Sequence, residues 1–204
     1  MRKFKKESCP NILLESHSKR NPKPRWVVYG DKYNRKRQDN PSFEFIFPQI
    51  KGLKLNRILV PILMKATDNH CSYCDDFPLL SADKTIDHFK PKSKFYNEVC
   101  QWENLYIACG HCQNVKASQF DNMLLRPDDE DYDFHHYFVY DYSTHKICVR
   151  DDLIGNKLKR AEITHKILDF NYEGMVESRR LSYDGFVDKP NYPKELLKHR
   201  FIFE

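Results

Sequence analysis

Two C-x-x-C pairs constrain this chain more than any other feature of its sequence. Cys71 and Cys74 form the first pair, Cys109 and Cys112 form the second, and 34 residues separate the two. Each pair places two sulfur atoms on one tight turn, and two such pairs complete a tetrahedral thiolate site for a zinc ion. A redox dithiol or ordinary buried thiols at the first pair would leave the second pair unexplained. The spacing therefore predicts a structural Zn²⁺ site that encloses a folded segment.

The remaining cysteines are interpreted as free thiols in packing roles, since seven cysteines cannot all pair. They are Cys9, Cys100 and Cys148. No apolar run follows the basic residues 2–3, so the sequence predicts no signal peptide. The longest apolar run, residues 58–64, is too short to span a bilayer. We therefore expect a protein of the reducing cytoplasm that does not enter the membrane.

Positive charge is concentrated near the N-terminus. Residues 1–37 contain twelve Lys and Arg against three Asp and Glu, a local balance of +9 in a chain with net charge +5. Trp26, Tyr29 and Tyr33 lie among these charges, a combination that suits phosphate contact with base stacking. The same composition also fits a solvated, partly disordered tail. Because prolines are frequent, residues 1–52 are predicted to form a basic, Pro-rich arm, extended or irregular, that packs partly on the core.

Short apolar segments between the cysteine pairs predict a ββα unit clamped by zinc. Residues 84–88 and 104–108 are β-prone, and residues 113–120 can open a helix. Before this unit, apolar residues at helical spacing predict an amphipathic helix over 53–66, kinked or started near Pro61.

Beyond the zinc segment, the pattern predicts a β-hairpin followed by two helices. The expected elements are strands at 137–140 and 146–150 and helices at 156–169 and 173–182. The fold class is therefore predicted to be α+β. Its expected parts are the arm (1–52), a core with the four-cysteine site (53–135), and an extension of hairpin and helices (136–204).

Asp87 and His88 lie in the first β-prone segment and offer the parts of a hydrolytic site. A histidine has an unperturbed pKa near 6.5 and can take a proton from water at neutral pH. The Asp87 carboxylate can hold a hard ion such as Mg²⁺, which would stabilise the charge that develops when a phosphodiester is cleaved. Asn104, on the facing segment, is predicted to hold the His88 ring or its backbone in place by hydrogen bonding.

The pattern Asp87-His88, Asn104 and Cys109-x-x-Cys112 resembles the ββα-metal site of HNH endonucleases. Over roughly residues 55–180 the chain also resembles the HNH nuclease subunit of Septu-type antiphage systems, which occurs beside some retrons as well. The segments that carry this second resemblance are Thr85–Ser93, Trp102–Leu105, Leu124–Asp131 and the helix near Ala161–Asn171.

The resemblance implies a zinc-braced ββα-metal fold and an endonuclease that uses Mg²⁺ or Mn²⁺ as its catalytic ion. It implies a substrate of DNA or RNA, of which we expect DNA, and an SMC-type or ABC-type ATPase as partner. In that family setting, His88 would be the general base, Asp87 a metal ligand and Asn104 the orienting residue.

One position departs from the HNH pattern. In HNH sites the residue after the last cysteine is usually His or Asn and serves as the second metal ligand, but here it is Gln113, followed by Asn114. Either Gln113 substitutes, or Asn114 reaches the ion, or the metal binds weakly. His111 is a further candidate, beside its interpretation as a solvent-facing residue. The departure also supports a competing hypothesis, a zinc-dependent nucleic-acid or protein-binding module whose active site has decayed.

Four lysines near the Asp-His pair are candidates for nucleic-acid binding. Lys90, Lys92 and Lys94 follow the pair closely and are predicted to contact phosphates that flank the scissile bond. Lys116 lies one helical turn after Gln113 and could do the same. Its alternative interpretation is a surface lysine near the thiolate cluster.

Two further clusters receive structural interpretations. The acidic residues of 128–133 could bind metal, but they are interpreted as a helix-capping, solvated turn. His135 and His136 could form a second metal site, but they are interpreted as partly exposed strand residues next to the predicted hairpin.

Overall fold

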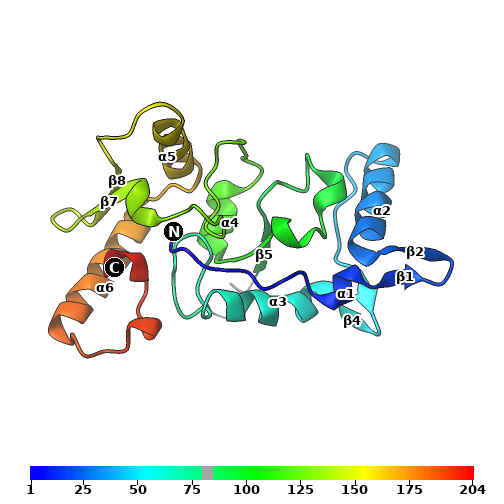
Figure 1. The fold of residues 1–204 in the computed structure, drawn as a ribbon, viewed down its shortest axis with the longest axis horizontal. Helices are drawn as coiled ribbons and strands as arrows, with labels where there is room; N and C mark the ends of the chain where they lie inside the picture. Colours follow the sequence, from blue (N-terminus) through cyan, green and yellow to red (C-terminus); the bar gives the residue numbers. More distant parts are fainter. Residues whose placement is uncertain (80–84) are drawn as a thin grey trace.

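The structure is a computed structural model that describes residues 1–79 and 85–204. Its elements form three groups along the longest axis of the molecule, with the segment between the cysteine pairs in the middle (Figure 1). The N-terminal helices lie toward one end and the C-terminal helices at the other. Within the described residues, each sheet has two antiparallel strands. No helix in this part of the chain is long and apolar enough to cross a membrane.

The middle group is a ββα unit, as the sequence predicts. Strands β5 and β6 pair in antiparallel register, with His88 opposite Leu105, and the helix α4 follows β6 directly. All four residues of β6 are buried, so this strand lies in the core. The elements of the middle group in chain order are β5 (Thr85–His88), the 3-10 helices η1 (Tyr96–Glu98) and η2 (Trp102–Asn104), β6 (Leu105–Ala108) and α4 (Gly110–Lys116).

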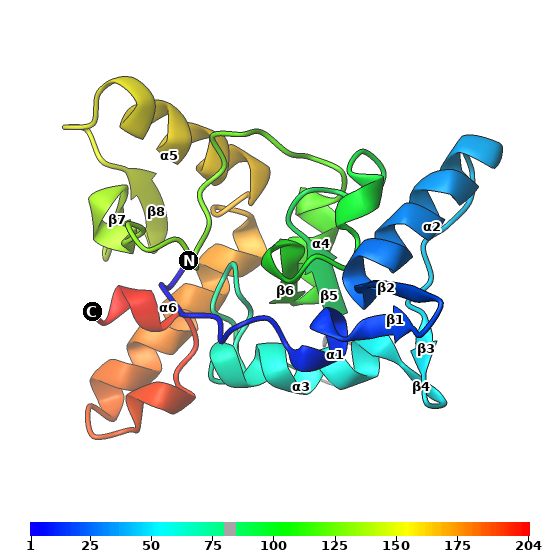
Figure 2. The same cartoon turned by 45° about the vertical axis from the view of Figure 1, so that its right-hand side comes forward.

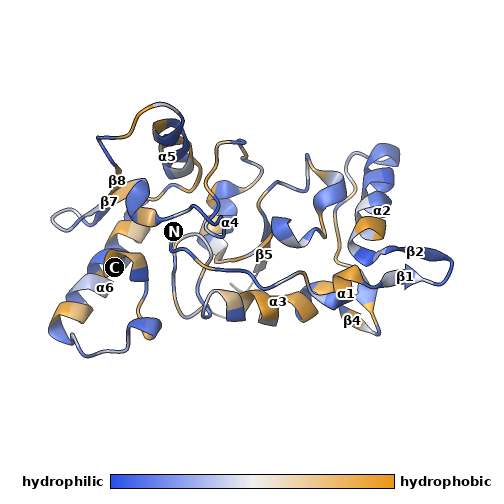
Figure 3. Ribbon diagram, in the orientation of Figure 1, coloured by the Kyte–Doolittle hydropathy of each residue, from blue (hydrophilic) through white to orange (hydrophobic). Residues whose placement is uncertain are grey.

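Helix α3 (Leu55–Ala66) supports this unit from below in the view of Figure 1 and carries a dense apolar face (Figure 3). Leu55, Leu59 and Leu63 recur every four residues and are all buried. Burial of each such side chain contributes about 1.5–3 kcal/mol. Pro61 lies inside α3, on its exposed side, and the helix continues through it. The prediction that the helix starts near Pro61 is therefore wrong.

The N-terminal residues are more regular than the predicted irregular arm. They form α1 (Asn11–Leu14), β1 (Ser16–Ser18), β2 (Asn21–Pro24), α2 (Arg25–Asp39), β3 (Gln49–Ile50) and β4 (Leu53–Lys54). Helix α2 is hard to recognise because its buried residues are only Val28, Gly30 and Tyr33, a narrower apolar stripe than a surface helix usually has. The division at residues 52 and 135 stays a prediction.

Gly30 allows α2 to rest directly on η1. A Cβ atom at this position would lie 2.1 Å from the carbonyl oxygen of Asn97, so no side chain fits there. Tyr33 packs edge-on against Tyr96 of η1, with ring centroids 5.8 Å apart. Helix α2 is therefore attached to the connection between β5 and β6.

The first residues of the chain cross the middle group and are not a solvated tail. The indole Nε1 of Trp102 donates a hydrogen bond of 2.9 Å to the carbonyl of Glu7. The side chain of Lys6 is buried, and its ammonium lies 3.6 Å from the ring centroid of Tyr106. Burial lowers the pKa of Lys6 to about 8.

The acidic residues of 128–133 were predicted to form a solvated turn, and Asp128 does not fit that prediction. Its side chain is buried and forms ion pairs with Lys6 at 3.4 Å and Arg126 at 3.2 Å. Burial alone would raise the pKa of Asp128, but the Lys6 ammonium and the hydrogen bonds from Arg126 and Tyr106 lower it below its ordinary value. Capping does occur at Asp133, whose carboxylate accepts from the backbone N–H of His135 at 2.8 Å.

The C-terminal group contains a hairpin and two helices where the sequence predicts them, although His135 and His136 lie in a 3-10 helix and not in a strand. The hairpin lies between α5 and α6 (Figure 2). Arg179 of α6 is buried and donates to the carbonyls of His145 and Phe170, both at 2.9 Å, which joins α6 to the hairpin. The elements are η3 (Phe134–His136), β7 (Phe138–Asp141), β8 (Lys146–Val149), α5 (Gly155–Ile167), α6 (Glu173–Asp188), η4 (Lys194–Leu196) and η5 (Arg200–Ile202).

Candidate functional site

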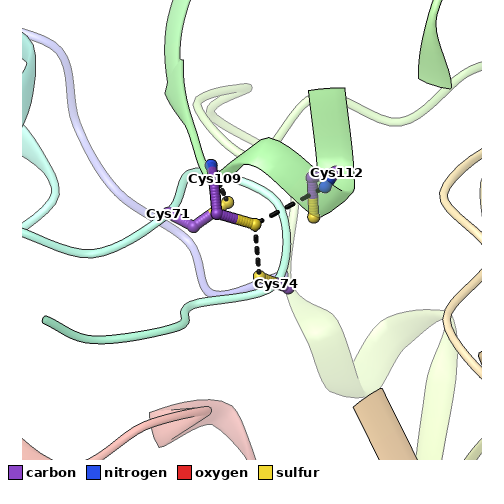
Figure 4. A group of neighbouring side chains, drawn as sticks. All are labelled: Cys71, Cys74, Cys109 and Cys112. Atoms are coloured by element: carbon purple, nitrogen blue, oxygen red, sulfur yellow. Dashed lines mark hydrogen bonds between the residues drawn. The ribbon is translucent and has the colours of Figure 1, made fainter. Parts of the chain in front are cut away.

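The two C-x-x-C pairs converge on one point (Figure 4). Their four sulfur atoms all lie within 4.8 Å of one another, and those of Cys74 and Cys109 are 3.7 Å apart. Zinc–sulfur bonds of about 2.3 Å in a tetrahedron place neighbouring sulfurs about 3.8 Å apart. The four buried thiols therefore have the spacing that a structural zinc ion requires.

Backbone amides point toward these sulfur atoms. The N–H of Cys109 donates to the sulfur of Cys71 at 3.3 Å, and the N–H of Cys112 donates to the sulfur of Cys109 at 3.5 Å. Hydrogen bonds from the side chains of Cys112, Cys71 and Cys74 hold the pKa of the Cys109 thiol well below its usual value. The same side-chain hydrogen bonds raise the pKa of the Cys74 and Cys112 thiols well above the usual value, so of these three thiols Cys109 is the one held as the thiolate that zinc binds.

The C-terminal residues brace the first cysteine pair. The imidazole Nδ1 of His199 lies 2.7 Å from the carbonyl oxygen of Cys74. The guanidinium of Arg200 donates to both carboxylate oxygens of Asp75, at 3.0 and 2.8 Å. These partners are 125 residues apart in the chain, so no local sequence pattern predicts that they interact.

Strand β5 delivers Asp87 and His88 to the wall of a pocket of about 460 Å³. Their exposed fractions are only 5% and 7%. The pocket is completed by the loop Pro91–Ser93, by the C-terminal end of α4, and by two phenylalanines of the N-terminal segment.

The imidazole of His88 is held in one tautomer. Its Nε2 lies 2.9 Å from the carbonyl oxygen of Val99, which can only accept, so Nε2 carries the proton and Nδ1 is the basic nitrogen. Burial lowers the pKa of His88 to about 4, and the positive charges of Lys92 and Lys116 act in the same direction. The ring is therefore neutral at pH 7 and able to accept a proton.

Lys116 was predicted either to contact a phosphate or to lie on the surface near the thiolate cluster, and its burial fits neither prediction. Its side chain is fully buried, because α4 packs against β5 and turns it inward. The ammonium lies 3.0 Å from Oδ2 of Asp87 and donates to the carbonyl of His88 at 2.7 Å. Tyr73 donates to the same carboxylate oxygen at 2.7 Å. Lys116 thus fixes both residues of the Asp-His pair from inside the protein.

Asp87 keeps one oxygen for another partner. Its two contacts both fall on Oδ2, and no hydrogen bond within the described residues uses Oδ1. Burial raises the pKa of Asp87, while the Lys116 ammonium and the Tyr73 hydroxyl oppose that rise. The carboxylate is therefore a buried acceptor that borders the pocket with spare lone pairs.

Asn104 holds the backbone around His88, and its side-chain hydrogen bonds within the described residues do not go to the ring. Its Oδ1 accepts from the N–H of Lys90 at 2.7 Å, and its Nδ2 donates to the carbonyls of Lys90 and Glu98, both at 3.1 Å. The residue after Glu98 is Val99, whose carbonyl meets the imidazole. The amide of Asn104 therefore fixes the loop that orients His88.

The candidates for a second metal ligand occupy different places. Gln113 lines the pocket together with Asp87, and its Oε1 accepts from the Thr85 hydroxyl at 3.0 Å. Asn114 is exposed and does not line this pocket. His111 stacks on Tyr172 with ring centroids 4.7 Å apart and borders a different cavity. Of the three, Gln113 alone shares the pocket with Asp87.

The three lysines after the Asp-His pair also differ. Lys92 lines the pocket. Lys90 forms an ion pair with Glu98 at 3.0 Å, so its charge is already balanced. Lys94 is exposed outside the pocket. Of the three, Lys92 alone lines the pocket of Asp87 and His88.

Phe45 and Phe47 are pocket residues that the sequence reasoning missed. Phe47 stacks on His88 with an interplanar angle of 19° and centroids 6.0 Å apart, and Phe45 meets the same ring edge-on at 5.8 Å. The alternation of Phe43, Phe45 and Phe47 is a period-2 signal that could have marked an extended segment with one packed face.

A scan of family models gives one match in the region of this site. The model described as HNH endonuclease covers residues 71–119, which include both cysteine pairs and the Asp87-His88 strand. A search of curated proteins gives no match to the chain. The segment that matches the HNH endonuclease model thus contains the four-cysteine cluster together with Asp87, His88 and Gln113 of the pocket.

Proposed function

We propose that the protein is a metal-dependent endonuclease that hydrolyses phosphodiester bonds of nucleic acid, with DNA as the preferred substrate. One observation carries this proposal: a neutral histidine, its tautomer set by the Val99 carbonyl, shares a pocket with a buried carboxylate inside the HNH domain. A phosphodiester needs a water nucleophile, a base and positive charge to be cleaved. The pocket provides residues for each requirement.

The donor set of the pocket suits a hard divalent ion such as Mg²⁺ or Mn²⁺. Asp87 and Gln113 would hold it through a carboxylate and an amide oxygen, with remaining positions left to water and the substrate, as Mg²⁺ prefers. When bound, the ion would stabilise negative charge on the phosphate and on the leaving 3′ oxygen. The separate four-cysteine cluster would hold structural zinc, because soft thiolates suit that ion.

The protein's own residues then take distinct roles. His88 accepts a proton from water at Nδ1. The hydrogen bond from Nε2 to the Val99 carbonyl keeps the ring proton on Nε2 and so leaves Nδ1 free. Lys92 contacts the phosphate electrostatically. Lys116 opposes the rise in the pKa of Asp87 that burial causes, and Asn104 holds the loop that orients the base.

The biological setting is a finer proposal that rests on the sequence resemblance. The segments Thr85–Ser93, Trp102–Leu105 and Leu124–Asp131 support an assignment to the nuclease subunit of a Septu-type antiphage system. In that setting an SMC-type or ABC-type ATPase would be the partner and would restrain cleavage in the cytoplasm. Comparison of cleavage by the isolated chain and by the chain with the product of a neighbouring ATPase gene tests this: equal rates would reject restraint by the partner.

A binding module with a decayed active site is the second candidate function. Two observations favour it: Lys116 already balances the charge of Asp87, and Thr85 already occupies one lone pair of the Gln113 amide. Such a module would retard DNA in a gel and leave it intact. An endonuclease would nick it when Mg²⁺ or Mn²⁺ is added.

Plasmid nicking by the wild type and by His88→Ala tests the proposed function. We expect metal-dependent nicking by the wild type and none by His88→Ala, with zinc content and far-UV circular dichroism unchanged. His136→Ala is the matched control, because His136 is exposed and distant in sequence from the pocket. Nicking by His88→Ala at the wild-type rate would reject His88 as the base, and a wild type that binds but never nicks would favour the binding module.

A further inference from the structure

A second groove lies beside the pocket of His88, and the two share one residue. Helix α2 forms one wall with Tyr29, Lys32 and Lys36, and residues 43–48 form the other. The groove has a volume of about 260 Å³ and is called the α2 groove below. Phe45 lines both the α2 groove and the pocket of His88. The two cavities are therefore adjacent and share one aromatic side chain in their walls.

The walls of the α2 groove are held by contacts within the protein. Tyr33 is buried at the base and packs against Phe45, with ring centroids 5.2 Å apart, and against Phe43 at 6.2 Å. The carbonyl of Phe43 accepts from Arg37 at 3.3 Å, and its N–H donates to Asn40 at 2.9 Å. These bonds tie residues 43–48 to α2, so the groove exists without a ligand.

The groove combines aromatic faces with unbalanced positive charge. Lys32 and Lys36 are four residues apart and therefore lie on one face of α2. Both are exposed, and within the described residues neither forms an ion pair with a carboxylate. The ammonium of Lys36 lies over the ring of Phe43, 4.6 Å from its centroid. The ammonium of Lys32 also lies 3.3 Å from Nε2 of the His17 imidazole. Flat rings next to ammonium groups that have no carboxylate partner in this part of the chain suit stacked bases and phosphates together.

We propose that the α2 groove binds a single, unpaired nucleic-acid strand and leads it to His88, an inference that rests on the proposed nuclease function. Bases stack on Tyr29 and on the phenylalanines of 43–48, while phosphates contact Lys32 and Lys36. A duplex hides the faces of its bases, so it cannot use the aromatic wall. Phe45 lies 5.8 Å from the His88 ring, which brings the bound strand to the proposed base.

Fluorescence anisotropy of a labelled DNA probe tests the α2 groove. The probe is a mixed-sequence strand of about 20 nucleotides, longer than the site of one single-strand binding fold, alone or annealed to its complement. The full zinc-loaded chain is titrated without added divalent ions at several salt concentrations. Lys32→Gln/Lys36→Gln removes the charges, and Tyr29→Leu removes a stacking face. The control Lys157→Gln/Lys159→Gln makes the same charge change on α5, at the other end of the molecule (Figure 1).

We expect the wild type to bind the single strand at least tenfold more tightly than the duplex. The lysine variant should weaken binding and lower the slope of log affinity against log salt by about 1.4, since each phosphate contact on a single strand contributes about 0.7. Tyr29→Leu should weaken binding about tenfold with little change in slope, and Tyr29→Phe should restore it. The control should bind as the wild type does.

Two results would overturn the inference. One is a lysine variant that binds like the control, and the other is a duplex bound as tightly as the single strand. The proposed function fails separately from the groove. If the chain binds the single strand through these residues but cuts no nucleic acid, the groove proposal stands and the nuclease proposal is rejected. If the chain cuts nucleic acid, and the groove lysine variant binds the single strand as tightly as the control lysine variant, the nuclease proposal stands and the groove proposal is rejected.

Discussion

Replacement of Lys116 by methionine examines the buried contact on which the geometry of the pocket depends. Methionine keeps a long unbranched side chain and removes the ammonium group, with its charge and its hydrogen-bond donors. In the wild type, the Lys116 ammonium neutralises Asp87 at 3.0 Å and satisfies the carbonyl of His88 at 2.7 Å. After the change, the Asp87 carboxylate keeps only the Tyr73 hydroxyl, and the carbonyl loses this donor.

The expected loss is large because both partners are buried. Removal of one member of a buried ion pair costs about 3–5 kcal/mol, since the other charge stays behind without compensation. A domain of this kind has a total stability of about 5–15 kcal/mol, so Lys116→Met should lose a substantial fraction of it. If Lys116 were a surface lysine, which is one interpretation of the sequence, the same change would lower the free energy of unfolding by only about 0–1 kcal/mol.

The loss should also depend on pH. Burial already raises the pKa of Asp87, and without the Lys116 ammonium the folded-state pKa rises further above its unfolded value. The folded variant then takes up a proton that the unfolded chain does not, so acidification stabilises it relative to the wild type. The deficit in unfolding free energy should therefore shrink between pH 7.5 and pH 5.5.

Urea unfolding at both pH values, followed by circular dichroism with zinc content measured in parallel, checks this reasoning. Asp87→Asn and the double variant Asp87→Asn/Lys116→Met complete a cycle in which the double variant should lose less than the sum of the single ones. Lys92→Met is the control, a partly exposed lysine of the same pocket. A cost below about 1 kcal/mol for Lys116→Met, together with weaker nucleic-acid binding, would refute the buried role and favour the phosphate contact.

Three further expectations concern the base and the zinc site. Because burial lowers the pKa of His88 to about 4, its proton-accepting form persists in mild acid, and single-turnover cleavage rates should decline only below about pH 5; a decline centred near pH 6.5 would contradict this. Cys109→Ser should release zinc and unfold at least residues 71–119, since a structural zinc contributes on the order of 10 kcal/mol, and unchanged zinc content and melting temperature would argue against a tetrathiolate site. Arg200→Met should lower the unfolding free energy by about 3–5 kcal/mol because it leaves Asp75 buried without a cation, whereas Arg180→Met on the exposed face of α6 should change little; equal effects would remove the case for C-terminal bracing.

The ββα unit and the metal cluster could be predicted because their information is local. Two sulfur atoms on one turn need only a spacing of three residues, and short β-prone segments need only a few neighbouring apolar residues. The β5 and β6 strands, α4 and the C-terminal hairpin lie within a few residues of their predicted positions for this reason. Helix α2 could not be predicted in the same way, because its packing depends on one narrow stripe and on the contact of Gly30 with Asn97.

The sequence by itself determined which groups are available: four thiolates for zinc, an adjacent Asp87 and His88, and an amide at position 113. The tertiary structure decided what surrounds them. It turned Lys116 inward against Asp87, placed Phe45 and Phe47 on the His88 ring, and brought Arg200 to Asp75 across 125 residues. The physical reason is that burial and charge pairing depend on partners distant along the chain, whereas metal-ligand spacing and strand propensity depend on near neighbours.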